Sequence, residues 1–197
     1  MRIGVLAVQG SFSLHLRMLE KIGVQPVEVR RSIELESIDG IILPGGESTT
    51  FQIVMGIDDL GERLRRAIQA GLPTWGTCAG AIILGYNRQD RVQGWKLIDI
   101  EVLRNAYGRQ VDSFVAPLKI KSFDTGFNGV FIRAPVFRNP GRTVEIFATL
   151  EGDPVMARQG NILITSFHPE LTSDSRAHEY FLHDVCHGSS REGIKSA

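Results

Sequence analysis

The first half of the chain alternates short, mostly apolar runs with segments in which apolar residues recur at helical spacing. The first helical segment is expected to begin near Phe12 and to end at Gly23, and a longer one is expected to run to about Ala70. The strands that this alternation predicts span Ile3–Val8, Val27–Val29, Asp39–Leu43 and Leu72–Trp75. Strands that alternate with helices are typical of repeated βαβ units, so a parallel sheet is expected here.

The second half of the chain is richer in strands and has few helices between them. The strands expected there span Ile98–Leu103, Phe114–Ile120, Gly129–Ile132, Val144–Leu150, Pro154–Ala157 and Ile162–Phe167. A closing helix is expected over Ser175–Cys186. The predicted fold class is therefore α/β, with a doubly wound, mostly parallel sheet flanked by helices and added antiparallel strands in the second half.

The composition is that of one globular domain. Of the 197 residues, 43% are hydrophobic, which is enough to bury a sizeable core. No internal repeat or interdomain linker divides the chain. A single domain is therefore predicted over residues 1–187, followed by a small, polar and flexible tail over residues 188–197.

Charge and cysteine content exclude several classes of partner. Lys+Arg and Asp+Glu each total 22, and no segment gathers the cations that a nucleic acid requires. No apolar stretch is long enough to span a membrane, and the run Ile3–Val8 is too short for a signal peptide. The two cysteines, Cys78 and Cys186, are expected to be free thiols in a reducing cytoplasm. Neither nucleic acid nor a membrane is expected as a partner.

The sequence Gly-Thr-Cys-Ala-Gly at residues 76–80 has the form of a nucleophile elbow with cysteine in place of serine. It lies between a predicted strand and an apolar helix, and a sharp strand-to-helix turn leaves little room for side chains two residues on either side of Cys78. Backbone N–H groups at the helix start would stabilise a thiolate and an oxyanion. The competing interpretation is a buried structural cysteine, which is the role expected for Cys186.

A base for this thiol is suggested by Ser-Phe-His-Pro-Glu at residues 166–170. Pro169 favours extended geometry at His168, so His168 and Glu170 are expected to project to one side of a strand end, where the carboxylate orients the imidazole. Four histidines compete for this role: His15, His178, His183 and His187. The last two have the i, i+4 spacing of metal ligands, but no third ligand accompanies them, so no metal site and no cofactor are expected.

The sequence Leu-Pro-Gly-Gly-Glu-Ser-Thr-Thr at residues 43–50 follows the third predicted strand. In a parallel sheet it should lie at the same carboxyl edge as the cysteine elbow. The Gly-Gly pair allows a backbone N–H, near Gly46, to join that of Ala79 in an oxyanion hole, and Glu47 is suited to hold an ammonium group. A phosphate loop is the rival interpretation, but the Walker lysine is missing and Glu47 would repel an anion. A tight turn followed by a Ser48 helix cap is the simplest alternative.

With these three segments in this order, the chain resembles the class I (triad) glutamine amidotransferases, which have a flavodoxin-like fold. Within them it is most similar to the glutaminase subunits of pyridoxal 5'-phosphate synthases. The segments that carry the resemblance are residues 43–50, 76–80, 104–114, 129–135 and 166–172, which extend across nearly the whole chain. One departure is Ser11-Phe12 after Gln9-Gly10, where a small residue is expected.

The resemblance implies hydrolysis of L-glutamine to L-glutamate and ammonia through a cysteine thioester, with a triad of Cys78, His168 and Glu170. It also implies a partner, a barrel-shaped, oligomeric synthase subunit that receives the ammonia and makes pyridoxal phosphate. The residues implied to contact glutamine are Gly46, Glu47, Ser48, Arg104, Ile132 and Arg133.

Three other functions remain open on the sequence. The chain could serve another triad amidotransferase, or it could be a cysteine peptidase or stress hydrolase on a similar sheet. The peptidase interpretation leaves residues 104–114 and the His168-Pro169-Glu170 segment without a role. The third is a non-catalytic nucleotide- or flavin-binding module on a flavodoxin-like sheet, which Glu47 opposes.

Overall fold

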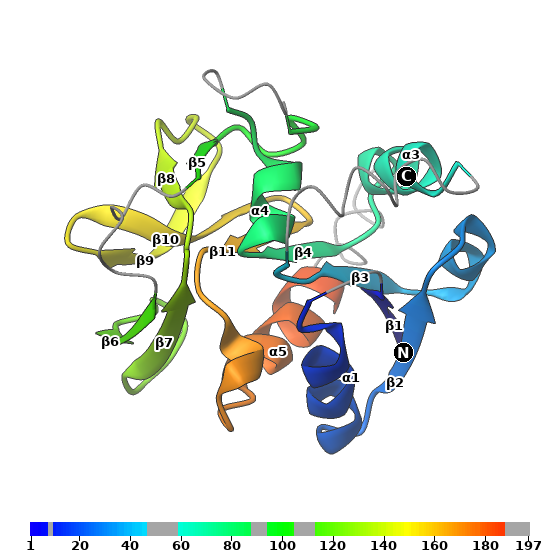
Figure 1. Cartoon of the computed structure of the whole chain (residues 1–197), viewed down its shortest axis with the longest axis horizontal. Coiled ribbons are helices and arrows are strands. Elements are labelled where there is room, and N and C mark those ends of the chain that lie inside the picture. Colours follow the sequence, from blue (N-terminus) through cyan, green and yellow to red (C-terminus); the bar gives the residue numbers. More distant parts are fainter. Residues whose placement is uncertain (8–9, 47–58, 88–93, 105–112, 188–197) are drawn as a thin grey trace, which may run out of the picture.

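A twisted seven-stranded sheet forms the centre of the molecule (Figure 1). The computed structural model describes residues 1–7, 10–46, 59–87, 94–104 and 113–187. The strand order is β2-β1-β3-β4-β11-β10-β9, and the first five are mutually parallel. The parallel strands are β1 (Arg2–Leu6), β2 (Gln25–Val29), β3 (Gly40–Leu43), β4 (Thr74–Thr77) and β11 (Ile162–Thr165). At one edge β10 (Asp153–Gln159) and β9 (Glu145–Leu150) pair antiparallel.

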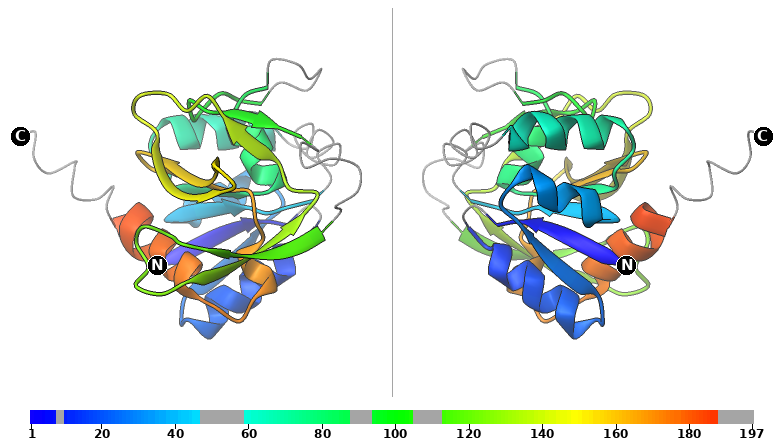
Figure 2. Two further views of the ribbon diagram at one scale, coloured as in Figure 1. Left: turned by 90° about the vertical axis from the view of Figure 1, so that its left-hand side faces the viewer. Right: turned by 90° about the vertical axis from the view of Figure 1, so that its right-hand side faces the viewer.

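Helices cover both faces of this sheet, as Figures 1 and 2 show. On one face lie α1 (Phe12–Lys21) and α5 (Arg176–Tyr180), which continues as a π-helical segment over Phe181–Cys186. On the other face lie α3 (Leu60–Gln69) and α4 (Ala79–Leu84). Each face has its own hydrophobic core, because strand residues alternate between the two sides. Leu19, Trp75 and Phe181 belong to the first core, and Leu43, Leu64 and Ile82 to the second.

Two small antiparallel sheets lie beside the main one. One pairs β5 (Glu101–Leu103) with β8 (Val136–Arg138), and the other pairs β6 (Ser113–Leu118) with β7 (Phe127–Ile132). Phe131 of β7 is fully buried and stacks on Phe114 with ring centroids 4.8 Å apart. The β6–β7 hairpin is thereby fixed to the core at the end where β7 reaches Ile132.

The predicted fold class is confirmed, and so are the parallel pairing of the first half and the antiparallel strands of the second. Several boundaries were wrong. The second strand includes Pro26, because β2 is an edge strand and an edge position tolerates a residue without an N–H. The fourth strand begins at Thr74 and extends to Thr77, since its pairing with β11 continues to that residue. The last strand ends at Thr165, before Phe167.

Other elements were missed or fall outside the described residues. The strand β8 and a 3-10 turn over Ser32–Ser37 were not expected from the sequence. Val8, the helical region before residue 59 and the predicted tail at 188–197 are outside the residues that the structure describes. Among the described residues, no helix is both long enough and apolar enough to cross a membrane.

Candidate active site

Cys78 stands at a sharp turn between β4 and α4. Its backbone has φ 47° and ψ −102°, a conformation that costs a residue with a side chain about 1–3 kcal/mol. Its N–H donates to the carbonyl of Thr165 at 2.8 Å, so the turn is fixed to β11. The residue is 8% exposed. The predicted elbow between a strand and a helix is therefore present.

The two glycines that flank this elbow have no room for a side chain. A Cβ on Gly80 would lie 2.0 Å from the carbonyl oxygen of Leu43, and a Cβ on Gly76 would lie 2.7 Å from the carbonyl carbon of Gly80. Both contacts are with backbone atoms, which cannot move aside as the tip of a flexible side chain could. The steric argument for glycine at these positions is confirmed, because α4 packs directly against the end of β3.

His168 and Glu170 come together immediately after β11. His168 has extended geometry (φ −106°, ψ 90°), and its N–H donates to Val130 of β7 at 2.8 Å. Glu170 lies in a 3-10 turn over Pro169–Leu171, and its Oε1 is 2.7 Å from Nδ1 of His168. The contact is as predicted, but the turn produces it, whereas the sequence predicted a continuous strand end.

Electrostatic interactions favour the charged forms of both groups. Burial lowers the pKa of His168, but hydrogen bonds with Cys78 and Glu170 outweigh burial and raise it to about 10. Burial raises the pKa of Glu170, but the proximity of His15 and the hydrogen bonds from His168 and Ser11 lower it to about 2. Because Nδ1 of His168 faces Glu170, Nε2 remains for the thiol. The arrangement can support a thiolate beside an imidazolium whose orientation is set by a buried carboxylate.

The raised pKa of His168 predicts a specific dependence of stability on pH. A group whose pKa is higher in the folded state contributes stability that is complete below its unfolded value of 6.5 and is lost as the pH rises through about 10. We expect the excess free energy of unfolding of the wild type over His168→Asn to decline across that interval. Urea denaturation at several pH values measures it. His183→Asn, which alters an exposed histidine, should show no such trend, and a flat difference for His168→Asn would contradict the charged form.

The Pro-Gly-Gly turn after β3 packs against both reactive side chains. A Cβ on Gly45 would lie 2.3 Å from Cε1 of His168 and 3.3 Å from Cβ of Cys78. The carbonyl of Gly45 accepts the N–H of Ser11 at 3.4 Å, and Gly46, which follows it, is exposed. The predicted neighbourhood of this turn and the elbow is confirmed. The other two expected contacts of this segment, Glu47 and Ser48, lie outside the described residues.

The end of β7 borders the thiol from the other side. The Cys78 Sγ lies 3.8 Å from the carbonyl oxygen of Ile132, a residue that is 39% exposed. Arg133 follows with a positive φ of 43°, so the chain turns sharply beside the site. Arg104 follows β5, whose last residue pairs with Val136, and the continued register brings it beside the segment that follows Arg133. The structure thus brings Ile132 to the cysteine, with Arg133 next to it in the chain, whereas Arg104 is placed only by its position after β5.

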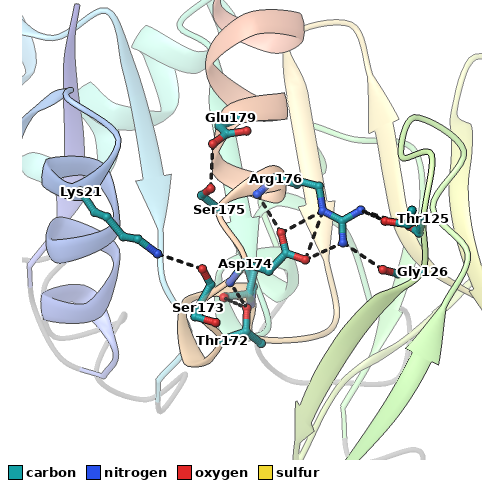
Figure 3. Close-up of polar contacts among 10 residues, drawn as sticks. Lys21, Thr125, Gly126, Thr172, Ser173, Asp174, Ser175, Arg176 and Glu179 are labelled. Carbon is teal, nitrogen blue, oxygen red and sulfur yellow. Dashed lines mark hydrogen bonds and ion pairs between the residues drawn. The ribbon is translucent and has the colours of Figure 1, made fainter.

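A polar network fixes the β6–β7 hairpin to the chain just beyond Glu170 (Figure 3). The guanidinium of Arg176 donates to both oxygens of Thr125 and to the carbonyl of Gly126, and it pairs with Asp174 at 2.6 Å. It also lies 5.1 Å from the ring centre of Phe123. Arg176 therefore holds the turn that precedes β7 against the start of α5.

A second group of polar residues, which was not expected from the sequence, lies behind Glu170. The hydroxyl of Ser11 donates to Oε1 of Glu170, and Nε2 of His15 lies 3.3 Å from Oε2. His178, on α5, lies against His15 on the side away from the carboxylate. One signal was available, because Ser11 and His15 are four residues apart and so share a face of the first helix.

The second cysteine has a packing role, as expected. Cys186 is 5% exposed and lies against Gly40, where a Cβ would be 2.9 Å from its Sγ. Burial and the charge of Asp39 raise its pKa to about 12, so the thiol is unreactive at neutral pH. Within the described part of the chain, no cluster of three or more His, Cys, Asp or Glu side chains is arranged to hold a metal ion.

The doubly wound sheet, the strained cysteine elbow and the histidine beside a buried carboxylate have the arrangement that the sequence predicts for a cysteine hydrolase of the triad type. Comparisons with known proteins show the family. A model of the SNO glutamine amidotransferase family matches residues 5–187. The chain belongs to this family.

Relatives and solved structures give the same result. The chain is 50% identical over 186 residues to "Pyridoxal 5'-phosphate synthase subunit PdxT" of Thermosipho africanus, covering 94% of this chain and 99% of the relative. It is 49% identical to the protein of that name from Fervidobacterium nodosum, covering 92% and 96%. A crystal structure described as a glutamine amidotransferase superposes with a TM-score of 0.86 at 43% identity, covering 92% and 97%.

Proposed function

We propose that this protein is the glutaminase subunit of a pyridoxal 5'-phosphate synthase, which hydrolyses L-glutamine to L-glutamate and ammonia. The observation that carries the chemistry is the strained elbow of Cys78 beside a histidine whose Nδ1 is 2.7 Å from a buried carboxylate. Membership of the glutamine amidotransferase family supports the choice of amide substrate. The names of relatives about half identical over nearly the whole chain support the choice of synthase.

In the first half-reaction, the thiolate of Cys78 attacks the side-chain amide carbon of glutamine. Backbone N–H groups near Gly46 and of Ala79 stabilise the oxyanion of the tetrahedral intermediate. The C–N bond then breaks as Nε2 of His168 transfers its proton to the departing nitrogen, which leaves as ammonia. The product on the enzyme is a γ-glutamyl thioester.

In the second half-reaction, water attacks the thioester. His168, now neutral, takes the proton of this water as it adds to the carbonyl carbon, and collapse of the intermediate breaks the C–S bond. Glutamate leaves, and the thiolate of Cys78 again faces an imidazolium. Throughout, Glu170 keeps Nδ1 of His168 protonated and stabilises the positive charge on the ring.

We assign the binding of glutamine to the border around the cysteine. The backbone carbonyl of Ile132, whose oxygen lies 3.8 Å from Sγ, is suited to accept a hydrogen bond from the α-amino group of the substrate. The guanidinium groups of Arg104 and Arg133 are suited to its α-carboxylate. Glu47 and Ser48 complete this proposed set, together with Gly46. Guanidinium groups in these roles would select a substrate with an α-carboxylate over an uncharged amide.

We assign the ammonia to a synthase subunit, a barrel-shaped oligomer that incorporates it into pyridoxal phosphate. A dedicated acceptor fits the chemistry, because glutamine hydrolysis without an acceptor wastes the substrate. We place the reaction in the cytoplasm, where free thiols such as Cys78 and Cys186 remain reduced.

The decisive experiment titrates purified synthase subunit into this protein and follows glutamate release. We expect the steady-state rate to rise about tenfold or more, which corresponds to about 1.4 kcal/mol of barrier. Pyridoxal phosphate should then form with glutamine as the sole nitrogen source.

The control supplies ammonium chloride to the synthase subunit alone, which should form pyridoxal phosphate without this chain. No glutamate release from a complex that sedimentation shows to be assembled would refute the function. An equal rate of glutamate release with and without the partner would contradict only the expected activation by docking.

A further inference from the structure

A buried line of polar side chains extends from Glu170 away from the cysteine. Oε1 of Glu170 accepts hydrogen bonds from Nδ1 of His168 and from the hydroxyl of Ser11. Oε2 accepts no hydrogen bond of good geometry among the described residues, and Nε2 of His15 lies 3.3 Å from it. Nδ1 of His15 is in turn 2.9 Å from Nε2 of His178. Both histidine side chains are fully buried.

The protonation of this line follows from its contacts. A neutral imidazole has one N–H, and only one ring nitrogen of each close histidine pair can donate to the other. If His15 donated to His178, a bare nitrogen lone pair would face the carboxylate, and His178 would carry an N–H at Nδ1, an atom that has no partner. If His178 donates instead, His15 carries its proton on Nε2, on the side of Glu170 and Thr77. The second arrangement puts no lone pair against the carboxylate, and at Nδ1 of His178 it leaves an unpartnered acceptor in place of a buried, unpartnered N–H.

The surroundings keep both rings neutral. Burial lowers the pKa of His15, although the charge of Glu170 opposes the shift, and burial lowers that of His178 further. The groups that surround His15 are the hydroxyl of Thr77, at 3.5 Å from Nε2, the edge-on ring of Trp75, and the charged pair His168–Glu170. At neutral pH the imidazole of His15 is therefore mostly neutral, with its N–H on the side of the carboxylate, and its charge acts on Glu170 only when the pH falls far enough to protonate the ring.

We propose that His15 is a positioning residue for the glutaminase reaction: its Nε2–H, 3.3 Å from the far oxygen of Glu170, limits the rotation of that carboxylate, and His178 fixes the position of this N–H on the ring. This inference rests on the proposed function. Glu170 lies in a short turn, and its own segment supplies only the contact with His168. Helix α1 supplies the rest, from Ser11 at its start and from His15 one turn later. Together with the two hydrogen bonds to Oε1, the contact with His15 limits rotation of the carboxylate away from the imidazole of His168.

The test separates the two ring nitrogens of His15. His15→Gln places an amide nitrogen near the position of Nε2, facing Glu170, whereas His15→Asn places its amide near Nδ1, facing His178. We expect His15→Asn to lower kcat for glutamine about tenfold in the complex with the synthase subunit, the scale of one lost contact to a charged group. The KM should not change, since His15 does not contact the substrate. His15→Gln should restore kcat to within about threefold of the wild type.

A second readout does not depend on glutamine. The rate of alkylation of Cys78 by iodoacetamide at neutral pH reports the thiolate that the imidazolium of His168 stabilises. It should fall about threefold in His15→Asn and recover in His15→Gln. His183→Asn makes the same replacement at an exposed histidine and should change neither readout.

The outcomes are distinguishable. Equal kcat and equal alkylation rates for His15→Asn and the wild type would overturn the positioning role. So would equal losses in His15→Asn and His15→Gln, because a purely structural role does not discriminate between the two nitrogens. If the wild-type complex releases no glutamate, the proposed function fails, and the alkylation rates alone then decide on His15.

Discussion

Cys78→Ala is expected to reduce glutamine hydrolysis to the background rate. The thiolate is both the nucleophile of the first half-reaction and the leaving group of the second, so no other group can replace it. The loss should be on the order of a millionfold, as for other hydrolytic triads that lose their nucleophile. Glutamate release by the complex with the synthase subunit is the measurement.

Cys186→Ala is the matched control for this variant. It removes the other thiol of the chain, which is buried against Gly40. Because the pKa of this thiol is raised to about 12, it is not reactive at neutral pH, and most activity should remain in the variant. A glutamine analogue that carries a diazoketone should label Cys78 alone. Normal turnover by Cys78→Ala would eliminate the thioester mechanism.

Glu170→Gln should lower kcat by about two to four orders of magnitude while leaving the fold intact. The amide has nearly the shape of the carboxylate, but it does not stabilise an imidazolium and it can favour the wrong tautomer of His168. It also presents N–H groups to Ser11 and His15, which the structure has arranged as donors to a carboxylate. Steady-state kinetics, with KM and kcat determined separately, measure the effect.

Glu20→Gln is the control, because Glu20 is an exposed glutamate on α1 and lies outside the triad. Its kcat should equal that of the wild type. A Glu170→Gln enzyme within about twofold of the wild type would mean that the carboxylate has only a structural role in its turn.

The parts of the site that could be predicted from the sequence are those defined by short segments. Gly76, Cys78 and Gly80 predicted the elbow because steric exclusion acts between near neighbours in the chain. The Gly-Gly turn was placed correctly because parallel strands end at one edge of a sheet. The order of strands and helices in the first half was also predictable, because each βαβ unit is formed by consecutive segments of the chain.

The parts that escaped prediction depend on contacts between distant segments. Ser11 and His15, which complete the environment of Glu170, are separated from it by about 160 positions in the sequence. His15 and His178 meet only because α1 and α5 cover the same face of the sheet. Ser11 was noticed as a departure from the expected small residue, but its hydroxyl acquires a partner only after folding. Strand boundaries such as that at Thr77 shifted because pairing with β11, and not local propensity, decides where β4 ends.

The positive φ of Cys78 places stability and activity in opposition at one residue. In that conformation a residue without a side chain would be relaxed, and cysteine forgoes about 1–3 kcal/mol of the free energy of folding. Total stability of a domain is about 5–15 kcal/mol, so this is a noticeable share. Engineering that selects only for a higher melting temperature will therefore favour glycine at position 78. It will yield a more stable protein that has lost its nucleophile. Thermostabilised versions of this enzyme must be selected on turnover as well as on heat resistance.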